Sequence, residues 1–179
     1  MPIPRNREAE DLALRLFARG ARNKIVEHHT GLSPYVLRNI RRSLGYRRAT
    51  AGPIPYLGGT FVASREIQIH GSLFAAAYRR LGGTRVAAEI EVDAMIAAYD
   101  IYRRLVEARK RLSFNDAWVI ARDLRGGGVA LVPCANCAVD YLSCESSRAP
   151  PTCPYCALYH RHGIGRQAAG RRTWSEPKC

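Results

Sequence analysis

Four cysteines near the C-terminal end of the chain form two Cys-x2-Cys pairs. Cys134 and Cys137 make the first pair, and Cys153 and Cys156 make the second after fifteen intervening residues. This spacing matches the four-thiolate zinc pattern, in which each pair closes a tight turn and directs two sulfurs at one ion. Four thiolates leave no coordination position for water or substrate, so the pattern predicts one structural Zn²⁺. Cys144 lies in the intervening loop, as a free thiol or as an alternative ligand.

The remainder of the chain must hold this zinc module in place, and its pattern is helical. Apolar residues recur at helical spacing over most of the chain before residue 129. The expected fold is therefore mainly α: a helical domain with a helix-turn-helix-like N-terminal part and a small C-terminal four-cysteine zinc module. The predicted parts are N-terminal helices (1–45), a Gly/Pro-rich connector (46–63), a helical core and partner-binding region (64–128), the zinc module (129–156) and a basic tail (157–179).

Local signals set the expected helix boundaries. Ser33, Ser64, Thr84 and Ser113 are polar residues of the kind that cap helix N-termini. The expected helices are 6–19, 21–29, 34–44, 64–82, 85–108 and 113–125, followed by a short strand at 129–132. The helix at 85–108 is apolar on more than one side, which indicates that it is deeply buried or shared with another subunit.

Residues 21–45 have the pattern of a helix-turn-helix, with Gly31 in the turn. In its second helix Val36, Leu37, Ile40 and Leu44 are expected to face inward. The outward set is Tyr35, Arg38, Asn39, Arg41 and Arg42, and Ser33 begins the helix. Arg reads guanine and Asn reads adenine in the major groove, so these six polar positions are candidate DNA-binding residues. A plain helical hairpin with a solvated Arg face is the alternative.

The charge balance favours a polyanionic partner. The formal net charge is +13, and all but three of the 28 basic residues are Arg, which binds phosphate and guanine through two hydrogen bonds at once. No acid occurs between Glu27 and Glu66. Candidate phosphate contacts are Arg47 and Arg48 after the second helix, and Arg161, Arg166, Arg171 and Arg172 in the tail. A generally basic protein with no such partner is the alternative reading of charge alone.

The sequence also bears on the cellular compartment of the protein and on whether it is an enzyme. The sequence has no apolar run long enough to span a membrane and no signal-peptide pattern, so a cytoplasmic protein with reduced cysteines is expected. An enzyme is not expected, because a zinc deaminase needs an H-x-E motif that the chain lacks. His28 and His29 end a predicted helix, where positive charge is favourable.

Several segments together resemble the flagellar transcriptional activator FlhC family over residues 8–156. They are LFARGARNKIVEHHTGLSPYVLRNIRRSLG, the Gly/Pro connector, REIQIHGSLFAAAY, VDAMIAAYDIYRRL, FNDAWVIARDL and the paired cysteines. The connector lacks the Trp-rich character of that family, and Cys144 is an additional thiol.

The resemblance implies a cytoplasmic, mostly helical subunit that binds one zinc through Cys134, Cys137, Cys153 and Cys156. It implies assembly with a FlhD-type subunit in a hetero-oligomer, binding to promoter DNA, recruitment of RNA polymerase and activation of flagellar genes. Two alternatives stay open. One is a zinc-containing protein-interaction adaptor, and the other is a divergent paralogue that regulates non-flagellar genes.

Overall fold

The computed structural model describes residues 7–45, 58–144 and 153–161. Most of these residues are helical, as the sequence predicts. The helices are α1 (Arg7–Phe17), α2 (Asn23–Thr30), α3 (Pro34–Ser43), α4 (Arg65–Gly82), α5 (Val92–Leu105), α6 (Phe114–Arg125) and α7 (Pro154–Arg161). Short 3-10 turns cover Gly58–Val62, Gly83–Ala87 and Ala108–Lys110, and the strands are β1 (Ala130–Pro133) and β2 (Asp140–Ser143).

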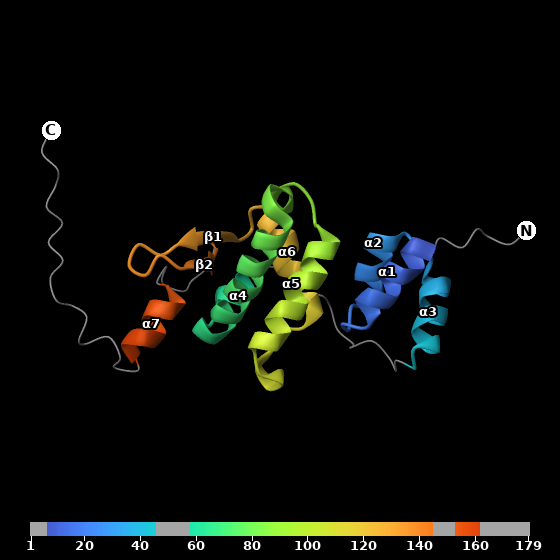
Figure 1. Cartoon of the computed structure of the whole chain (residues 1–179), viewed down its shortest axis with the longest axis horizontal. Coiled ribbons are helices and arrows are strands. Elements are labelled where there is room, and N and C mark those ends of the chain that lie inside the picture. The colour runs from blue at the N-terminus through green and yellow to red at the C-terminus, as the bar shows by residue number, and fades with distance from the viewer. Residues whose placement is uncertain (1–6, 46–57, 145–152, 162–179) are drawn as a thin grey trace, which may run out of the picture.

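The elements form an elongated molecule with the central helices α4, α5 and α6 in its middle (Figure 1). Helices α1 to α3 lie at one side of them, and the β1–β2 hairpin with α7 lies at the other. One buried apolar cluster runs through the molecule, from Leu16 and Phe17 of α1 through Phe74 and Tyr78 of α4 to Leu142 of β2. The two ends that carry the predicted functional residues are therefore fixed to the same core.

Three of the four predicted N-caps are confirmed. The side-chain oxygens of Ser33, Ser64 and Ser113 accept hydrogen bonds from backbone N–H groups in the first turns of α3, α4 and α6. Ser113 forms a full capping box with Asp116. These interactions are local in sequence, which is why the sequence alone placed them.

The helix predicted at 85–108 begins too early, because residues 85–91 are not part of it. Residues Gly83–Ala87 form a 3-10 turn, and α5 begins only at Val92. Gly83 has a φ of +61°, and a side chain on Gly82 would meet Val86 at 2.3 Å, so the chain folds tightly back on the end of α4. The Glu91 N–H then donates to the Tyr78 hydroxyl at 3.0 Å and fixes where α5 starts. Thr84 is consequently not the cap of a long helix.

Helix α5 has apolar residues along two sides, and only one of these stripes is buried. Met95, Ile96, Ala98, Tyr99 and Tyr102 are buried. The other stripe is accessible: Ala97 is exposed, the exposure of Ile101 is 42%, and that of Leu105 is 69%. The helix is thus half covered by its own chain and half available to another surface.

Two elements of the C-terminal part were not predicted. Strand β2 pairs antiparallel with β1, and Leu131 faces Leu142 across the pair. Helix α7 starts inside the zinc module and continues to Arg161, past the predicted start of the basic tail at 157. No helix in the described part of the chain has the length and apolar character that a membrane span requires.

Candidate metal centre and nucleic-acid interface

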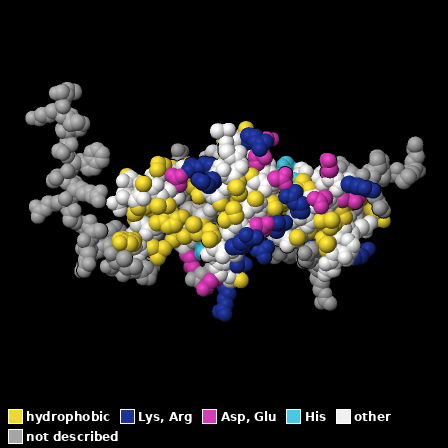
Figure 2. Space-filling model, viewed as in Figure 1, with side chains coloured by type: hydrophobic (Ala, Val, Ile, Leu, Met, Phe, Trp, Pro, Cys, Tyr) yellow, Lys and Arg dark blue, Asp and Glu magenta, His cyan; other side chains and the backbone are white. Residues whose placement is uncertain are grey.

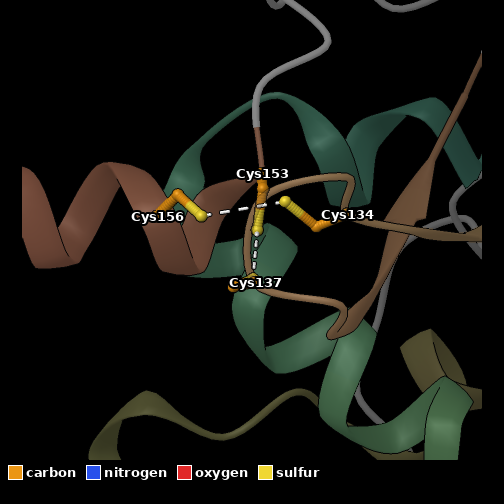
Figure 3. A group of neighbouring side chains, drawn as sticks. All are labelled: Cys134, Cys137, Cys153 and Cys156. Carbon is orange, nitrogen blue, oxygen red and sulfur yellow. Dashed lines mark hydrogen bonds between the residues drawn. The ribbon is translucent and has the colours of Figure 1, made fainter. Parts of the chain in front are cut away.

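The structure brings the four predicted cysteine ligands to one point. Cys134 and Cys137 lie in the loop between β1 and β2, Cys153 directly precedes α7, and Cys156 lies in its first turn. Figure 3 shows their sulfurs converging from these two directions. The Sγ atoms of Cys134 and Cys156 are 3.7 Å apart, as are those of Cys137 and Cys153, and all four lie within 4.8 Å of one another.

These distances fit a tetrahedral thiolate site. Zn–S bonds of about 2.3 Å place the sulfurs of a tetrahedron about 3.8 Å apart. The two 3.7 Å pairs match that edge and all four sulfurs lie within 4.8 Å of one another, so the group could hold one metal ion. Cys144 follows β2, packs against the apolar core and is not a member of the four-sulfur group.

Backbone N–H groups shape the first cysteine pair. The N–H groups of Cys137 and Asn136 hold the pKa of the Cys134 thiol at about 6, below its ordinary value of 9.0. Burial instead raises the pKa of the Cys153 thiol to about 12. Burial thus disfavours a thiolate at Cys153, and a bound cation would offset that cost.

Asn136 is a residue of the site that the sequence analysis missed. Its backbone N–H points at Cys134 Sγ and its side-chain amide at Cys156 Sγ, both at 3.4 Å. It therefore links the two cysteine pairs. Such outer contacts orient metal ligands and tune their basicity. The sequence shows that Asn136 lies between Cys134 and Cys137. Its contact with Cys156 depends on how the two cysteine pairs are arranged in space, which the sequence does not show.

Polar side chains of α4 hold the β1–β2 hairpin that carries the first pair. Gln68 donates to the Leu142 carbonyl, and the Leu142 N–H donates to the Ser72 hydroxyl, each at 2.8 Å. Both side chains are buried. Gly71 lies between them, where an added Cβ would stand 3.0 Å from the Leu142 side chain. The sequence signal was three small or polar residues within the apolar face of a predicted helix, at spacings of three and four.

Helix α3 and its N-cap expose five of the six residues predicted for the second helix of the helix-turn-helix. Ser33, Tyr35, Arg38, Asn39 and Arg42 are exposed, and the Ser33 side chain also caps the helix. Tyr35 is the most open of the large apolar side chains in α3, with 68% exposure. Arg38, Asn39 and Arg42 therefore lie on a free surface of one helix, as a recognition helix requires.

Arg41 corrects the predicted outward set. It is half-buried, its guanidinium lies 5.2 Å from the centre of the Phe17 ring, and it donates to Asn23 Oδ1 at 2.7 Å. These contacts tie α3 to α1 and α2, so Arg41 holds the three helices together. Leu44, predicted to face inward, is 37% exposed because it lies just past the last residue of α3.

The other predicted phosphate contacts have no described side chains. Arg47, Arg48, Arg166, Arg171 and Arg172 lie outside the described residues. Arg161 is the last residue of α7, and its side chain is likewise outside the described part. These residues remain sequence-based candidates.

The N-terminal helices are held to α5 and α6 by polar contacts. Asn115 of α6 accepts from the Arg22 N–H at 2.9 Å and donates to the Gly20 carbonyl at 3.2 Å. Arg15 pairs with Asp93 at 2.7 Å, and Arg19 Nε donates to Asp100 at 2.9 Å. The exposed face of α3 therefore has a fixed orientation relative to the central helices.

Comparison with known proteins gives one consistent result. The family model described as "Flagellar transcriptional activator (FlhC)" matches residues 3–169. A flagellar transcriptional regulator FlhC of Proteus mirabilis is 28% identical over 76% of this chain and 72% of its own length. Proteins of the same name from Sodalis glossinidius (31% identical, 74% and 68%) and Cupriavidus metallidurans (28% identical, 96% and 80%) also match.

Proposed function

Since the chain belongs to the FlhC family of flagellar transcriptional activators, we propose that it is the DNA-binding subunit of a bacterial complex that activates flagellar genes. The match over residues 3–169 is the observation that carries this proposal. It includes both the helix-turn-helix and the four cysteines. In this function the protein works in the cytoplasm and is not an enzyme.

The exposed face of α3 supports a direct role in DNA recognition. Arg38, Asn39 and Arg42 are exposed together on a helix with no acidic residue. Arg and Asn side chains form two-bond contacts with guanine and adenine edges. In the proposed complex α3 enters the major groove of promoter DNA, and Arg47, Arg48 and the basic tail contact phosphate.

The zinc centre has a structural role in this proposal. A Zn²⁺ ion bound by four thiolates stabilises the fold by linking two segments of the chain, and it has no open coordination position for water or substrate. The ion would then join the hairpin, which carries Cys134 and Cys137, to the start of α7, where Cys153 and Cys156 lie, as one rigid unit. Because Gln68 and Ser72 fix that hairpin to α4, the ion anchors the start of the basic tail to the helical body.

The accessible side of α5 supports assembly with a FlhD-type subunit. A groove of about 530 Å³ lies between α4, α5 and α7. Its apolar lining is Ile69, Leu73, Leu105, Val106, Ala157 and Leu158, and its polar lining is Arg65, Glu66, His70 and Glu107. Hydrophobic side chains gather over this region in Figure 2. Exposed apolar grooves of this kind mark protein-interaction sites. RNA polymerase would be recruited by the assembled complex.

The same groove favours a second candidate, an adaptor that binds proteins and not DNA. Co-expression of the full chain with a FlhD-type protein distinguishes the two. Size-exclusion chromatography with zinc analysis should give a complex with one zinc per chain, and that complex should bind promoter DNA with steep salt dependence. A stable complex that ignores DNA would favour the adaptor. Binding to promoters other than flagellar ones would favour a divergent paralogue.

A further inference from the structure

A group of arginines lies at the C-terminal end of α5 and in the turn that follows it. Residues 103–111 read RRLVEARKR, in which Glu107 is the single acid among five basic residues. Arg103, Arg104 and Arg109 are exposed, and Arg111 is half-buried. We refer to Arg103, Arg104, Arg109 and Arg111 as the α5 basic platform.

The turn that carries these arginines is firmly held. The Leu112 N–H donates to the Tyr102 hydroxyl at 2.9 Å, and the Tyr99 hydroxyl donates to the Leu112 carbonyl at 3.0 Å, and both bonds are buried. Arg111 Nε donates to the Val106 carbonyl at 2.6 Å. The backbone of the platform is thus ordered before any ligand arrives, which lowers the entropic cost of binding.

Most of this charge is not used inside the chain. Arg103 lies over the Tyr99 ring at 5.9 Å. Among the ion pairs of the described residues none involves Arg104 or Arg109, whereas Arg15, Arg19 and Arg79 are all paired with aspartates. Concentrated, exposed and unpaired arginines have the chemistry of a phosphate-binding surface.

The platform and α3 are close enough to reach one duplex. Arg41 of α3 contacts Phe17 at the end of α1, and Arg19, in the turn after α1, contacts Asp100 of α5. Arg104 follows Asp100 by about one helical turn, or ~6 Å. A short chain of direct contacts thus links the two surfaces, and a duplex of a few helical turns, each about 34 Å long, is long enough to touch both. Figure 1 shows α3 and the C-terminal end of α5 along the same lower edge, and Figure 2 shows Lys and Arg side chains over the lower half of α5.

We propose that the α5 basic platform is a second DNA contact, which binds the phosphate backbone of the duplex that α3 reads. This inference rests on the proposed DNA-binding function. Contacts to phosphate carry no base information, so the platform adds affinity and salt dependence and fixes how the protein lies along the duplex.

The test uses the full chain in complex with its FlhD-type partner. The variant Arg104→Gln/Arg109→Gln removes the two exposed arginines that have no described ion-pair partner, while Arg111, which holds the turn, stays. The matched control Arg80→Gln/Arg125→Gln removes two exposed arginines from the last turns of α4 and α6, at the opposite end of the central helices. Binding is measured at several salt concentrations on a promoter duplex and on a mixed-sequence duplex of about 40 base pairs, or roughly four helical turns.

The platform variant should bind both duplexes on the order of 10-fold more weakly, and its slope of log K against log salt should be shallower by roughly one to two. The preference for the promoter should persist. The control should match the wild type, and Arg104→Lys/Arg109→Lys should recover most of the slope because Lys keeps the charge.

Failure of the two proposals gives different results. If the wild-type complex binds neither duplex, the DNA-binding function itself fails. If the wild type binds and the platform variant matches it in affinity and slope, only the platform is overturned. Loss of the FlhD-type subunit from the platform variant would also overturn it, because the arginines would then serve a protein interface.

Discussion

The indole N–H of Trp118 donates a hydrogen bond to Nε2 of His29 across 2.9 Å and joins α6 to the last turn of α2. Indole can only donate, so His29 Nε2 must carry a lone pair. The guanidinium of Arg122 lies over the Trp118 ring, 5.6 Å from its centre. His29 was expected to add positive charge to the end of α2. The structure instead holds it neutral, as part of the contact between the N-terminal helices and the core.

This contact should make stability depend on pH. Burial, with His28 nearby, lowers the pKa of His29 from 6.5 to about 4. Between these values the unfolded chain binds more protons than the folded chain, so stability is full above pH 6.5 and falls as the pH drops toward 4. Since His29 is only partly buried, the expected loss is about 1–2 kcal/mol. Urea unfolding at pH 7.5 and pH 5 measures it.

The control for this prediction is His29→Gln, which keeps an acceptor for Trp118 and does not titrate. Between the two pH values this variant should lose less stability than the wild type, because Gln does not take up a proton. Protonation of the cysteines affects both proteins equally and therefore cancels in the comparison. Equal losses in the two proteins would show that His29 is not the group responsible.

Replacing one cysteine should remove the metal without removing the helix that follows. Ser is a good N-cap, so Cys153→Ser takes away a thiolate while α7 can still begin at Pro154. Zinc content should fall from one per chain to near zero by elemental analysis. Cys144→Ser should keep its zinc, since Cys144 is outside the four-sulfur group. Zinc loss in both variants would mean that Cys144 is a ligand.

Asn136→Ala should weaken metal binding without abolishing it. The amide and backbone N–H of Asn136 contact the sulfurs of both cysteine pairs, and loss of an outer partner typically costs about 10–100-fold in metal affinity. The substitution removes only the amide contact, so the lower part of that range is expected. Competition with a chromogenic chelator measures the change, and an unchanged affinity would contradict a role in the site.

Ala138→Gly should stabilise the metal-binding loop. Ala138 has a φ of +57° and is the single non-glycine residue with positive φ in the described ranges. A residue with a Cβ loses roughly 1–2 kcal/mol in this conformation, and glycine avoids that cost. Chemical denaturation of the zinc-loaded protein should show a gain of about 1 kcal/mol. Ala135→Gly, at a position without positive φ, should give a small loss instead.

Neighbouring arginines on α3 should separate stability from DNA recognition. Arg41→Ala removes the contacts with Phe17 and Asn23, so about 1–2 kcal/mol of unfolding free energy should be lost. Arg38 is exposed, so Arg38→Ala should stay within about 0.5 kcal/mol of the wild type and reduce discrimination between promoter and mixed-sequence DNA. Thermal unfolding measures the change in stability, and competition binding measures the discrimination between the two DNAs. If Arg38→Ala lost stability and Arg41→Ala lost discrimination instead, the two roles assigned here would be wrong.

Features that depend on neighbours along the chain could be predicted from the amino-acid sequence. The Cys-x2-Cys spacing of Cys134 and Cys137 identified one half of a metal site, and caps such as Ser33 and Ser113 marked where helices begin. The helix-turn-helix pattern and the mainly α fold followed from apolar periodicity. In each case the deciding contacts lie within a few residues, or within one turn of a helix.

Contacts between residues far apart in the sequence became visible only in the three-dimensional fold. The start of α5 depends on the hydrogen bond from Glu91 to Tyr78 of α4 and on Val86 packing against Gly82, so helical periodicity alone made the helix too long. Periodicity placed Arg41 on an outer face but could not show that Phe17 lies there. The pairing of Gln68 with Leu142 spans 74 residues. Such contacts form because buried polar groups must find partners and apolar surfaces must be covered, wherever in the sequence the partner lies.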